Sequence, residues 1–246
     1  MLELLFGTTN PGKLRELRRL VSGLDVRVVS PEDLERSLPE VVEDGCTFHE
    51  NAAKKASAYA RFSRLHALAD DSGLCVDALG GLPGVHSARW SDLDGLASPA
   101  CAVSQVAERE LGTELARSSR DEANNDKLLA ALAGVPEAQR GARYVAVLAL
   151  ARPDGTIAAQ VEGICTGRIG HVRRGSRGFG YDPLFFPDEG AGPSAIPGDR
   201  RAGAPVVERT MAELESSEKD AISHRGAAFR ALRPMLEKLA FDKSGR

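Results

Sequence analysis

The sequence predicts an α/β fold, because short apolar runs alternate with helical patterns along most of its 246 residues. Hydrophobic residues make up 42% of the chain, which is ample for the core of one large domain or of one domain with two lobes. No apolar run approaches the length that a bilayer requires, and the chain has no internal repeat. We therefore expect a soluble, globular, cytoplasmic protein.

The first half of the chain is expected to contain two helices and four strand segments. The helices are expected at residues 11–21 and 47–65, and the strand segments at 2–8, 26–30, 67–69 and 74–76. The side chains expected to point inward from the first helix are Leu14, Leu17, Leu20 and Val21.

The second half is expected to contain three helices and two strands. The helices are expected at residues 98–112, 122–133 and from about Ser223 onward, and the strands at 143–151 and 156–165. Residues 152–155, Arg-Pro-Asp-Gly, have the composition of a hairpin turn, and Pro234 is expected to kink or end the last helix. Residues 188–208 are rich in Gly, Pro, Ala and Arg without periodicity, which predicts a mobile surface loop.

The net charge limits the classes of partner. A formal charge of −3 argues against broad binding of nucleic acid, since duplex-binding domains usually carry a strongly basic face. A small anion in a local basic pocket remains compatible with this composition. The cysteines are widely spaced and lack a C-x-x-C pair, so we expect reduced and mostly buried thiols rather than a zinc site. They are Cys46, Cys75, Cys101 and Cys165.

Residues 7–14, Gly-Thr-Thr-Asn-Pro-Gly-Lys-Leu, lack only the Ser or Thr of a Walker A loop, whose place Leu14 takes. Asn10 is a good helix N-cap, and Pro11 fits the first helical position. Gly12 permits close approach to the backbone, and Lys13 lies in the first turn, where the helix dipole disfavours a cation. A bound anion would resolve that conflict, although a capped turn with a solvated lysine explains the stretch equally well.

Residues 43–55 lead into the second expected helix. Thr47 and Glu50 have capping-box spacing, and Glu50 and Lys54 form an i,i+4 pair, so helix stability explains these three residues. Lys55 falls instead near the centre of the inward face. A buried ammonium requires a negative partner, which is either a core carboxylate or a phosphate in a cleft.

Asp70 and Asp71 are adjacent carboxylates at the end of an expected strand. If the strand stays regular they cannot both face one side, so one is expected to point into a cleft while the other braces a neighbour. A carboxylate of this kind suits Mg²⁺, which takes one or two carboxylates and keeps water and phosphate oxygens as its other ligands. An ordinary acidic turn is the alternative.

Two late stretches have the chemistry to bind a purine base. Glycines flank Phe179 in Gly178-Phe179-Gly180-Tyr181-Asp182-Pro183, which exposes a ring on which a base can stack. Ser223 can cap the last helix so that His224 and Arg225 project from its first turn as hydrogen-bond donors. A turn and a capped helix explain either stretch considered singly.

Together these stretches closely resemble the inosine triphosphate pyrophosphatase family, also called non-canonical purine NTP pyrophosphatases or XTP/dITP diphosphatases. Six motifs match in the family's order over nearly the whole chain. They are residues 8–13, 43–55, 69–74, 79–84 with 87–90, 178–183, and Lys219 with 223–226. The loop at 188–208 is longer than expected for the family.

The resemblance implies one domain over residues 1–246, with two lobes around a long mixed sheet, flanking helices and an active-site cleft between the lobes. It implies a homodimer that hydrolyses ITP, dITP and XTP with Mg²⁺ between the α- and β-phosphates, giving the monophosphate and pyrophosphate. Neither nucleic acid nor a membrane is expected as a partner.

The resemblance also assigns roles to residues. Asp71 would be the catalytic base and a metal ligand, and Glu43 would be the second metal ligand. Residues 8–13 would bind the triphosphate, while His224 and Arg225 would donate to the 6-oxo group that adenine lacks. The full set of substrate-binding residues would be Thr8, Thr9, Asn10, Pro11, Gly12, Lys13, Lys55, Ser72, Phe179, Gly180, Tyr181, Asp182, Lys219, His224 and Arg225.

Two rival functions remain open from the sequence. A P-loop kinase or GTPase that lost its Ser or Thr would split the β–γ bond and release orthophosphate. A catalytically silent nucleotide-binding protein is the other, although both proposed metal carboxylates and the lysines are present.

Overall fold

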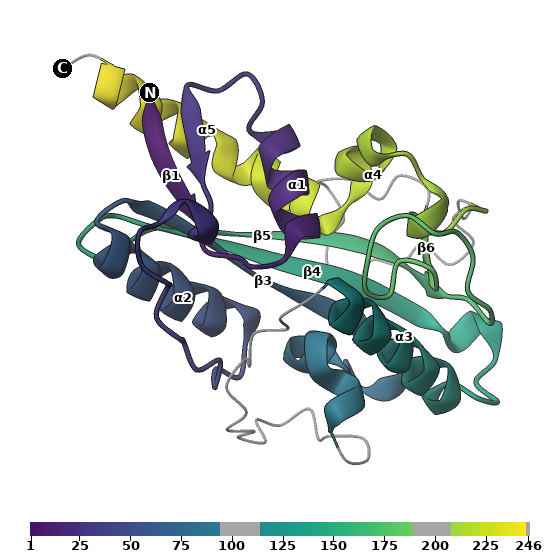
Figure 1. Ribbon diagram of the computed structural model, residues 1–246. Coiled ribbons are helices and arrows are strands. Elements are labelled where there is room, and N and C mark those ends of the chain that lie inside the picture. Colours follow the sequence, from purple (N-terminus) through teal and green to yellow (C-terminus); the bar gives the residue numbers. More distant parts are fainter. Residues whose placement is uncertain (94–113, 189–207, 245–246) are drawn as a thin grey trace.

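The computed structural model describes residues 1–93, 114–188 and 208–244, which form a mixed six-stranded sheet with helices on its faces (Figure 1). The helix expected at 98–112, and all but the ends of the loop expected at 188–208, lie outside the described residues.

The strands follow the spatial order β2-β1-β3-β4-β5-β6. Their bounds are Leu2–Phe6 (β1), Val26–Val29 (β2), His66–Val76 (β3), Gly141–Ala151 (β4), Ile157–Ile169 (β5) and Phe185–Pro187 (β6). β1 pairs in parallel with β2 and β3, whereas β4, β5 and β6 each run antiparallel to the strand before them in this order. β3, β4 and β5 are long enough to carry two separate packed regions.

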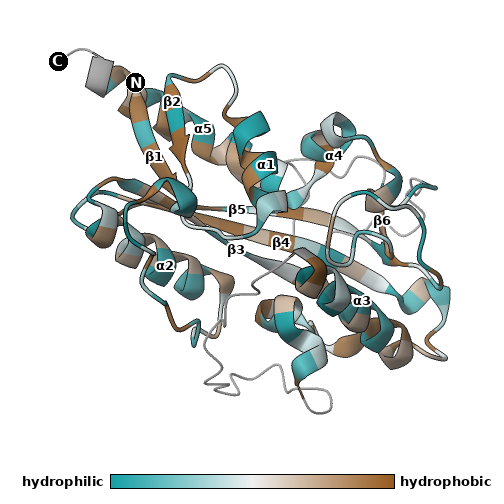
Figure 2. Ribbon diagram, in the orientation of Figure 1, coloured by the Kyte–Doolittle hydropathy of each residue, from teal (hydrophilic) through white to brown (hydrophobic). Residues whose placement is uncertain are grey.

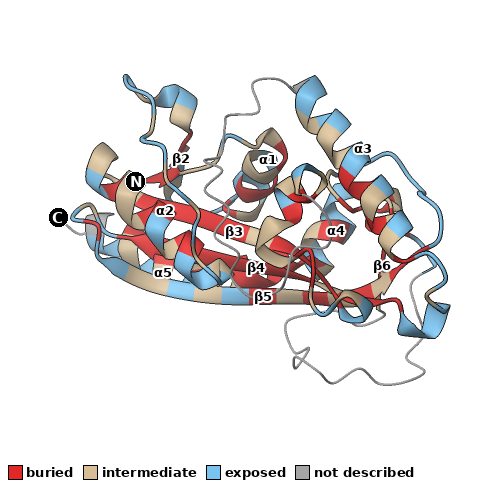
Figure 3. Ribbon diagram, turned by 90° about the horizontal axis from the view of Figure 1, so that it is seen from below, coloured by how far each residue is buried: buried red, intermediate tan, exposed pale blue. Residues whose placement is uncertain are grey.

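Near β1 the sheet is covered on both faces (Figure 1). α1 (Pro11–Leu20) and α5 (His224–Ser244) pack on one face, and α2 (Phe48–Ser63) packs on the other. Successive side chains of β3 point to opposite faces of the sheet. Leu68 therefore packs with α1 and α5, and Ala69 packs with α2. The central strands are accordingly among the most apolar and most buried parts of the chain (Figures 2 and 3).

A second core lies toward the other end of the long strands. There β3 and β4 pack against α3 (Glu114–Ala131) and the 3₁₀ segment Gly84–Asp92. Leu74 of β3 meets Trp90 and Leu128 in this core. α4 (Ser216–Ile222) then leads into α5. Two cores on one set of strands match the two lobes that the family resemblance implies.

The strand segments expected at 67–69 and 74–76 are wrong in one respect, because β3 is a single strand. Residues 70–73 are therefore not a turn, and Asp70 and Asp71 pair in register with Leu148 and Val147 of β4. Backbone pairing with β4, together with cations on both faces of the strand, overrides the low strand propensity of aspartate.

Other boundaries also differ from those expected. α3 begins at Glu114 rather than near 122, β5 continues to Ile169, and the short elements β6 and α4 were not expected. Pro234 does not end α5, because Leu232 and Leu236 on either side of it are buried in the same core and hold the helix to the sheet. The hairpin is confirmed: the N–H of Gly155 donates to the carbonyl of Arg152 at 2.7 Å.

The cysteines are partly as expected. Cys75 and Cys165 are free and buried. Cys46 is exposed and disulfide-bonded, so the expectation of a reduced thiol is wrong there; it lies in the loop before α2, where sulfur is accessible. Within the described ranges, no helix has the length and apolarity to cross a membrane.

Candidate active site

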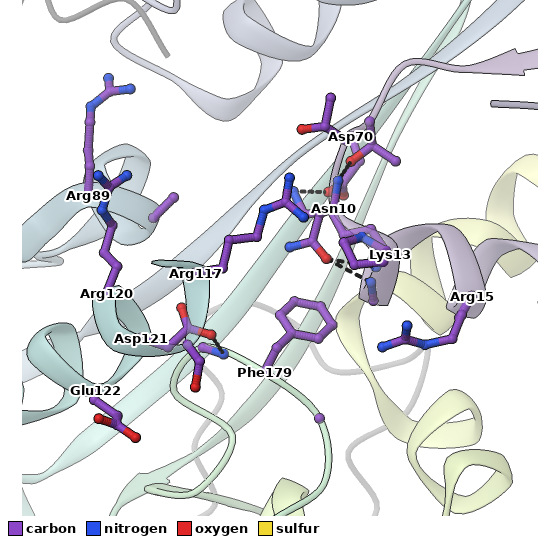
Figure 4. Close-up of a pocket in the computed structure, with 18 of the residues that line it drawn as sticks. Asn10, Lys13, Arg15, Asp70, Arg89, Arg117, Arg120, Asp121, Glu122 and Phe179 are labelled. Carbon is purple, nitrogen blue, oxygen red and sulfur yellow. Dashed lines mark hydrogen bonds and ion pairs between the residues drawn. The ribbon is translucent and has the colours of Figure 1, made fainter. Parts of the chain in front are cut away.

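A cleft of about 1210 Å³ opens between the loop that follows β1 and the N-terminal half of α3. Residues 7–13 form one wall, and Arg117 and Arg120 stand on the opposite wall, with Phe179 between them (Figure 4). Arg117 points across the cleft toward Asn10 (Figure 4). The volume is larger than the usual range for a pocket that holds one small ligand, which suits an extended molecule.

The loop after β1 is shaped by its own side chains. Oδ1 of Asn10 accepts hydrogen bonds from the backbone N–H groups of Gly12 and Lys13, at 2.8 and 3.2 Å, which confirms the predicted N-cap. Oγ1 of Thr8 accepts from the N–H of Asn10 at 3.2 Å. The loop therefore presents Lys13 to the cleft in a defined conformation.

Asp70 and Asp71 point to opposite faces of the sheet, as the sequence predicts for a regular strand. Asp70 faces α1 and α5, where Nζ of Lys13 lies 2.6 Å from its Oδ2. Asp71 faces α2, where Nζ of Lys55 lies 3.0 Å from its Oδ1. Only Asp70 contributes to the wall of the cleft directly.

Glu43 and Asp71 meet on one ammonium group. Nζ of Lys55 lies 2.5 Å from Oε1 of Glu43 as well as 3.0 Å from Oδ1 of Asp71, and all three side chains are more than 90% buried. This confirms that Lys55 points inward toward negative charge. Burial raises the pKa of Asp71 to about 6, since the carboxylate of Glu43 adds to burial while Lys55 opposes it.

Asn51 joins this group, and the sequence analysis missed it. Its Oδ1 accepts from the N–H of Gly45 at 2.8 Å, and its Nδ2 donates to Oδ2 of Asp71 at 3.4 Å. It thereby ties the loop that carries Glu43 to β3. The available signal was its position four residues before Lys55, on the same face of α2.

The other face of β3 carries a second buried ionic cluster. Arg225 donates to Oε2 of Glu16 at 3.1 Å and to Oγ of Ser72 at 2.8 Å, and it lies 3.4 Å from Oδ2 of Asp70. Burial alone would raise the pKa of Asp70, but Lys13 and Arg225 hold it well below its usual range. Asp70 is thus the charge that braces this side of the site.

Lys219 extends this cluster toward the turn that carries Phe179. Its Nζ lies 3.0 Å from Oε1 of Glu16 and 2.7 Å from Oδ2 of Asp182. Glu16 therefore anchors both Lys219 and Arg225. Sequence reasoning missed it, because Glu16 lies at the edge of the apolar stripe of α1, and its partners lie more than 200 residues away in the sequence.

The side chains of Tyr181 and His224 are occupied by neighbours. The hydroxyl of Tyr181 donates to the carbonyl of Ser87 at 2.9 Å. The ring of His224 stacks on Tyr144 with centroids 4.6 Å apart, and burial lowers the pKa of His224 well below its usual value, with Arg225 adding to this effect. His224 is therefore neutral and donates through one nitrogen only.

The structure divides the predicted site residues into two groups. Those that line the cleft are Thr8, Thr9, Asn10, Pro11, Gly12, Lys13, Lys55, Phe179 and Gly180. Those that lie outside the cleft lining, mostly in the buried clusters behind it, are Glu43, Asp71, Ser72, Tyr181, Asp182, Lys219, His224 and Arg225.

These features define a two-lobed α/β protein in which a lysine-bearing loop at a helix N-terminus lies beside a buried pair of carboxylates. The chain belongs to the Ham1 family, whose family model matches residues 4–235.

Individual relatives support this assignment over the full length. The chain is 66% identical to the dITP/XTP pyrophosphatase of Anaeromyxobacter dehalogenans, over 97% of this chain and 99% of the relative. It is 42% identical to the protein of the same name from Streptomyces avermitilis, with the same coverage.

Solved structures of the same family share the fold. A HAM1 protein from Coxiella burnetii superposes with a TM-score of 0.70 at 32% identity, covering 97% of this chain and all of the other. A nucleoside-triphosphatase, dITP/XTP pyrophosphatase, from Mycobacterium abscessus gives a TM-score of 0.61 at 39% identity, covering 95% of this chain and all of the other. The expected family and the expected mixed α/β fold are confirmed.

Proposed function

We propose that this chain is a nucleoside-triphosphate pyrophosphatase that hydrolyses dITP, XTP and ITP between the α- and β-phosphates, with Mg²⁺ as cofactor. The observation that carries the proposal is that two buried carboxylates, Glu43 and Asp71, share the ammonium of Lys55, which lines the cleft together with the loop at residues 8–13. The activity that gives the relatives their name supports the substrate class.

The residues present fit a magnesium ion. Oε1 of Glu43 and Oδ1 of Asp71 are buried and share the ammonium of Lys55, so both oxygens already face one positive charge. No third acidic, His or Cys side chain joins Glu43 and Asp71 within the part of the chain that the structure describes. Two carboxylates leave the remaining positions to water and phosphate oxygens, which is how Mg²⁺ is commonly bound. When bound, the ion would polarise the phosphates and acidify water.

Asp71 has the environment of a general base. A carboxyl group whose pKa is raised to about 6 is ionised at neutral pH and still accepts a proton readily. Asn51 holds Oδ2 of Asp71, and Lys55 holds Oδ1, so the carboxylate has a fixed orientation. It would take the proton of the water that attacks the α-phosphorus.

The lysines would balance the charge of the triphosphate. Lys13 and Lys55 line the cleft, while Lys219 lies behind it and places its ammonium 4.8 Å from the centre of the Phe179 ring. Cations aimed at the leaving pyrophosphate stabilise the transition state more than the ground state. Because Glu43 and Asp71 would hold the metal, the loop would have no need of a Walker hydroxyl at Leu14.

Base recognition would depend on Phe179, His224 and Arg225. The ring of Phe179 lies in the cleft, where a purine can stack on it. One nitrogen of His224 and an N–H of Arg225, whose guanidinium here donates to Glu16, Ser72 and Asp70, would turn to the 6-oxo group. Adenine offers these donors no acceptor at that position. We also propose, from the family resemblance alone, that the enzyme acts as a homodimer in the cytoplasm.

The products of ITP hydrolysis test this function. With Mg²⁺, the proposal predicts inosine monophosphate and pyrophosphate in equal amounts, and no orthophosphate until a phosphatase is added. Release of orthophosphate and inosine diphosphate would instead identify a β–γ phosphatase of the P-loop type. A preference for ATP over ITP at equal concentration would contradict the base-reading role of His224 and Arg225.

A further inference from the structure

The turn at residues 178–182 carries the Phe179 ring but has little regular structure of its own. Gly178 and Gly180 have φ values of +78° and +63°, in the region that glycine adopts at low cost. The peptide groups of the turn are held largely by side chains. The N–H of Phe179, for example, donates to Oδ2 of Asp182 at 3.0 Å.

Two side chains of α3 hold the backbone of Gly180 from both sides. Oδ2 of Asp121 accepts from the N–H of Gly180 at 2.7 Å, and Nδ2 of Asn125 donates to its carbonyl at 2.9 Å. Asp121 and Asn125 are four residues apart and so lie on one face of the helix. The same Nδ2 donates to the carbonyl of Asp121 at 2.8 Å, so both of its hydrogens are used.

α3 is a firm anchor for these two side chains. Asn124 accepts from the N–H of Ser91 at 2.7 Å, and Nζ of Lys127 donates to the carbonyls of Trp90 and Leu93 at 2.8 and 2.7 Å. These bonds tie α3 to the 3₁₀ segment of the second core. The backbone of α3 is therefore held in place, and so are the positions from which Asp121 and Asn125 extend.

The position of Gly180 decides where the Phe179 ring lies. A Cβ placed on Gly12 would lie 2.6 Å from Cδ1 of Phe179, so the ring packs directly on the first turn of α1. Figure 4 shows Asp121, joined by a dashed line to the turn, next to Phe179. α3 thus fixes, through Gly180, where the ring lies against the loop at residues 8–13.

We infer that Asp121 and Asn125 are positioning residues that hold the Phe179–Gly180 turn in the conformation that binds the purine base. The inference rests on the proposed function for the identity of the ligand. It assigns to Asp121 and Asn125 a part in base binding and none in binding the phosphates, which would lie against the loop after β1.

Steady-state kinetics with two ligands test this assignment. Asp121→Ala and Asn125→Ala should each raise KM for ITP about tenfold, the size of a weakened base stack. Inorganic tripolyphosphate has no base, so its inhibition constant should stay within about twofold of the wild-type value. Asp121→Asn keeps an acceptor for the N–H of Gly180 and should retain a near-wild-type KM.

The matched control is Asp126→Asn, which removes a charge from the exposed face of the same helix, where Asp126 pairs with Arg173. This variant should change neither KM for ITP nor the inhibition constant of tripolyphosphate. Equal changes in KM and in the tripolyphosphate constant for Asp121→Ala would show general damage to the site and overturn the inference, as would an unchanged KM.

Hydrogen exchange separates this inference from the proposed function. The segment containing Gly180 should exchange faster in Asp121→Ala than in wild-type protein, whether or not ITP is hydrolysed. Unchanged protection of this segment would refute the positioning role of Asp121 and Asn125 even if the enzyme is active. A wild-type protein that releases no pyrophosphate would refute the proposed function. Hydrogen exchange would then still decide whether Asp121 and Asn125 hold the turn.

Discussion

At the scale of single residues, the site depends on how buried charges are paired. Lys55 was predictable, because its place on the helical wheel turns it inward and a buried ammonium requires carboxylates. The opposite orientations of Asp70 and Asp71 also followed from strand geometry. Glu16 was not predictable, since its partners are brought close only by the fold, and the one signal for Asn51 was its place on the same helix face as Lys55.

Asp71→Asn should abolish most activity without destabilising the protein. The pKa of Asp71 is about 6 when folded, above its value of about 3.9 in an unfolded chain. The stabilisation that protonated Asp71 provides is therefore complete below about pH 3.9 and is lost as the pH rises through about 6. Asparagine cannot accept the proton of the attacking water, so kcat should fall about 10²- to 10⁴-fold. It also stays neutral at every pH, so Tm at pH 8 should match or exceed that of the wild type.

This comparison is made without Mg²⁺, by thermal unfolding at pH 8 and pH 4. The advantage of the variant should largely disappear at pH 4, where the wild-type carboxyl is protonated in the folded state and about half protonated in the unfolded state. A variant less stable than the wild type at pH 8 would contradict the environment assigned to Asp71.

Lys55→Met should be strongly destabilising when Mg²⁺ is absent. It leaves Glu43 and Asp71 buried without their shared cation, a change that typically costs about 3–5 kcal/mol. Lys54→Met is the matched control, because Lys54 pairs with Asp44 at an exposed position where solvent screening leaves the pair little effect on stability. Urea unfolding should separate the two variants, and Mg²⁺ should restore more stability to Lys55→Met than to the wild type. Equal losses for the two variants would show that Lys55 is not the counterion of the pair.

At the scale of elements, long periodic segments were predictable and short or acidic ones were not. α1, α2 and the hairpin between β4 and β5 follow from apolar periodicity and turn composition. β3 was divided in two because Asp70, Asp71, Ser72 and Gly73 disfavour strands locally. Pairing with β4 and close approach of Ser87 to Gly73 override that preference.

The last helix offers a test of packing against local propensity. Pro234 is exposed within α5, where it removes a backbone hydrogen bond while the buried residues around it keep the helix on the sheet. Pro234→Ala should therefore raise stability by up to about 3 kcal/mol, measured by urea unfolding, with kcat and KM unchanged. A loss of stability would mean that the backbone of α5 is adapted to proline.

At the scale of the whole molecule, the two cores place the groups of the site on different supports. The loop after β1 and the Glu43–Lys55–Asp71 group belong to the first core, whereas α3 and the 3₁₀ segment belong to the second. Phe179 lies between them and contacts the first turn of α1. The family motifs in the sequence marked nearly all parts of the first group, but they gave no sign of the α3 wall, whose Arg117, Arg120 and Asp121 lie in none of the matched segments.

The most direct test of this account is to locate the divalent ion in a complex with a non-hydrolysable ITP analogue, using anomalous diffraction from Mn²⁺. The account predicts a manganese peak within about 2.0–2.4 Å of carboxylate oxygens of both Glu43 and Asp71, with phosphate oxygens among its other ligands and Lys55 moved off the pair. A peak that touches neither carboxylate, with the ion held at the loop after β1 alone, would contradict it.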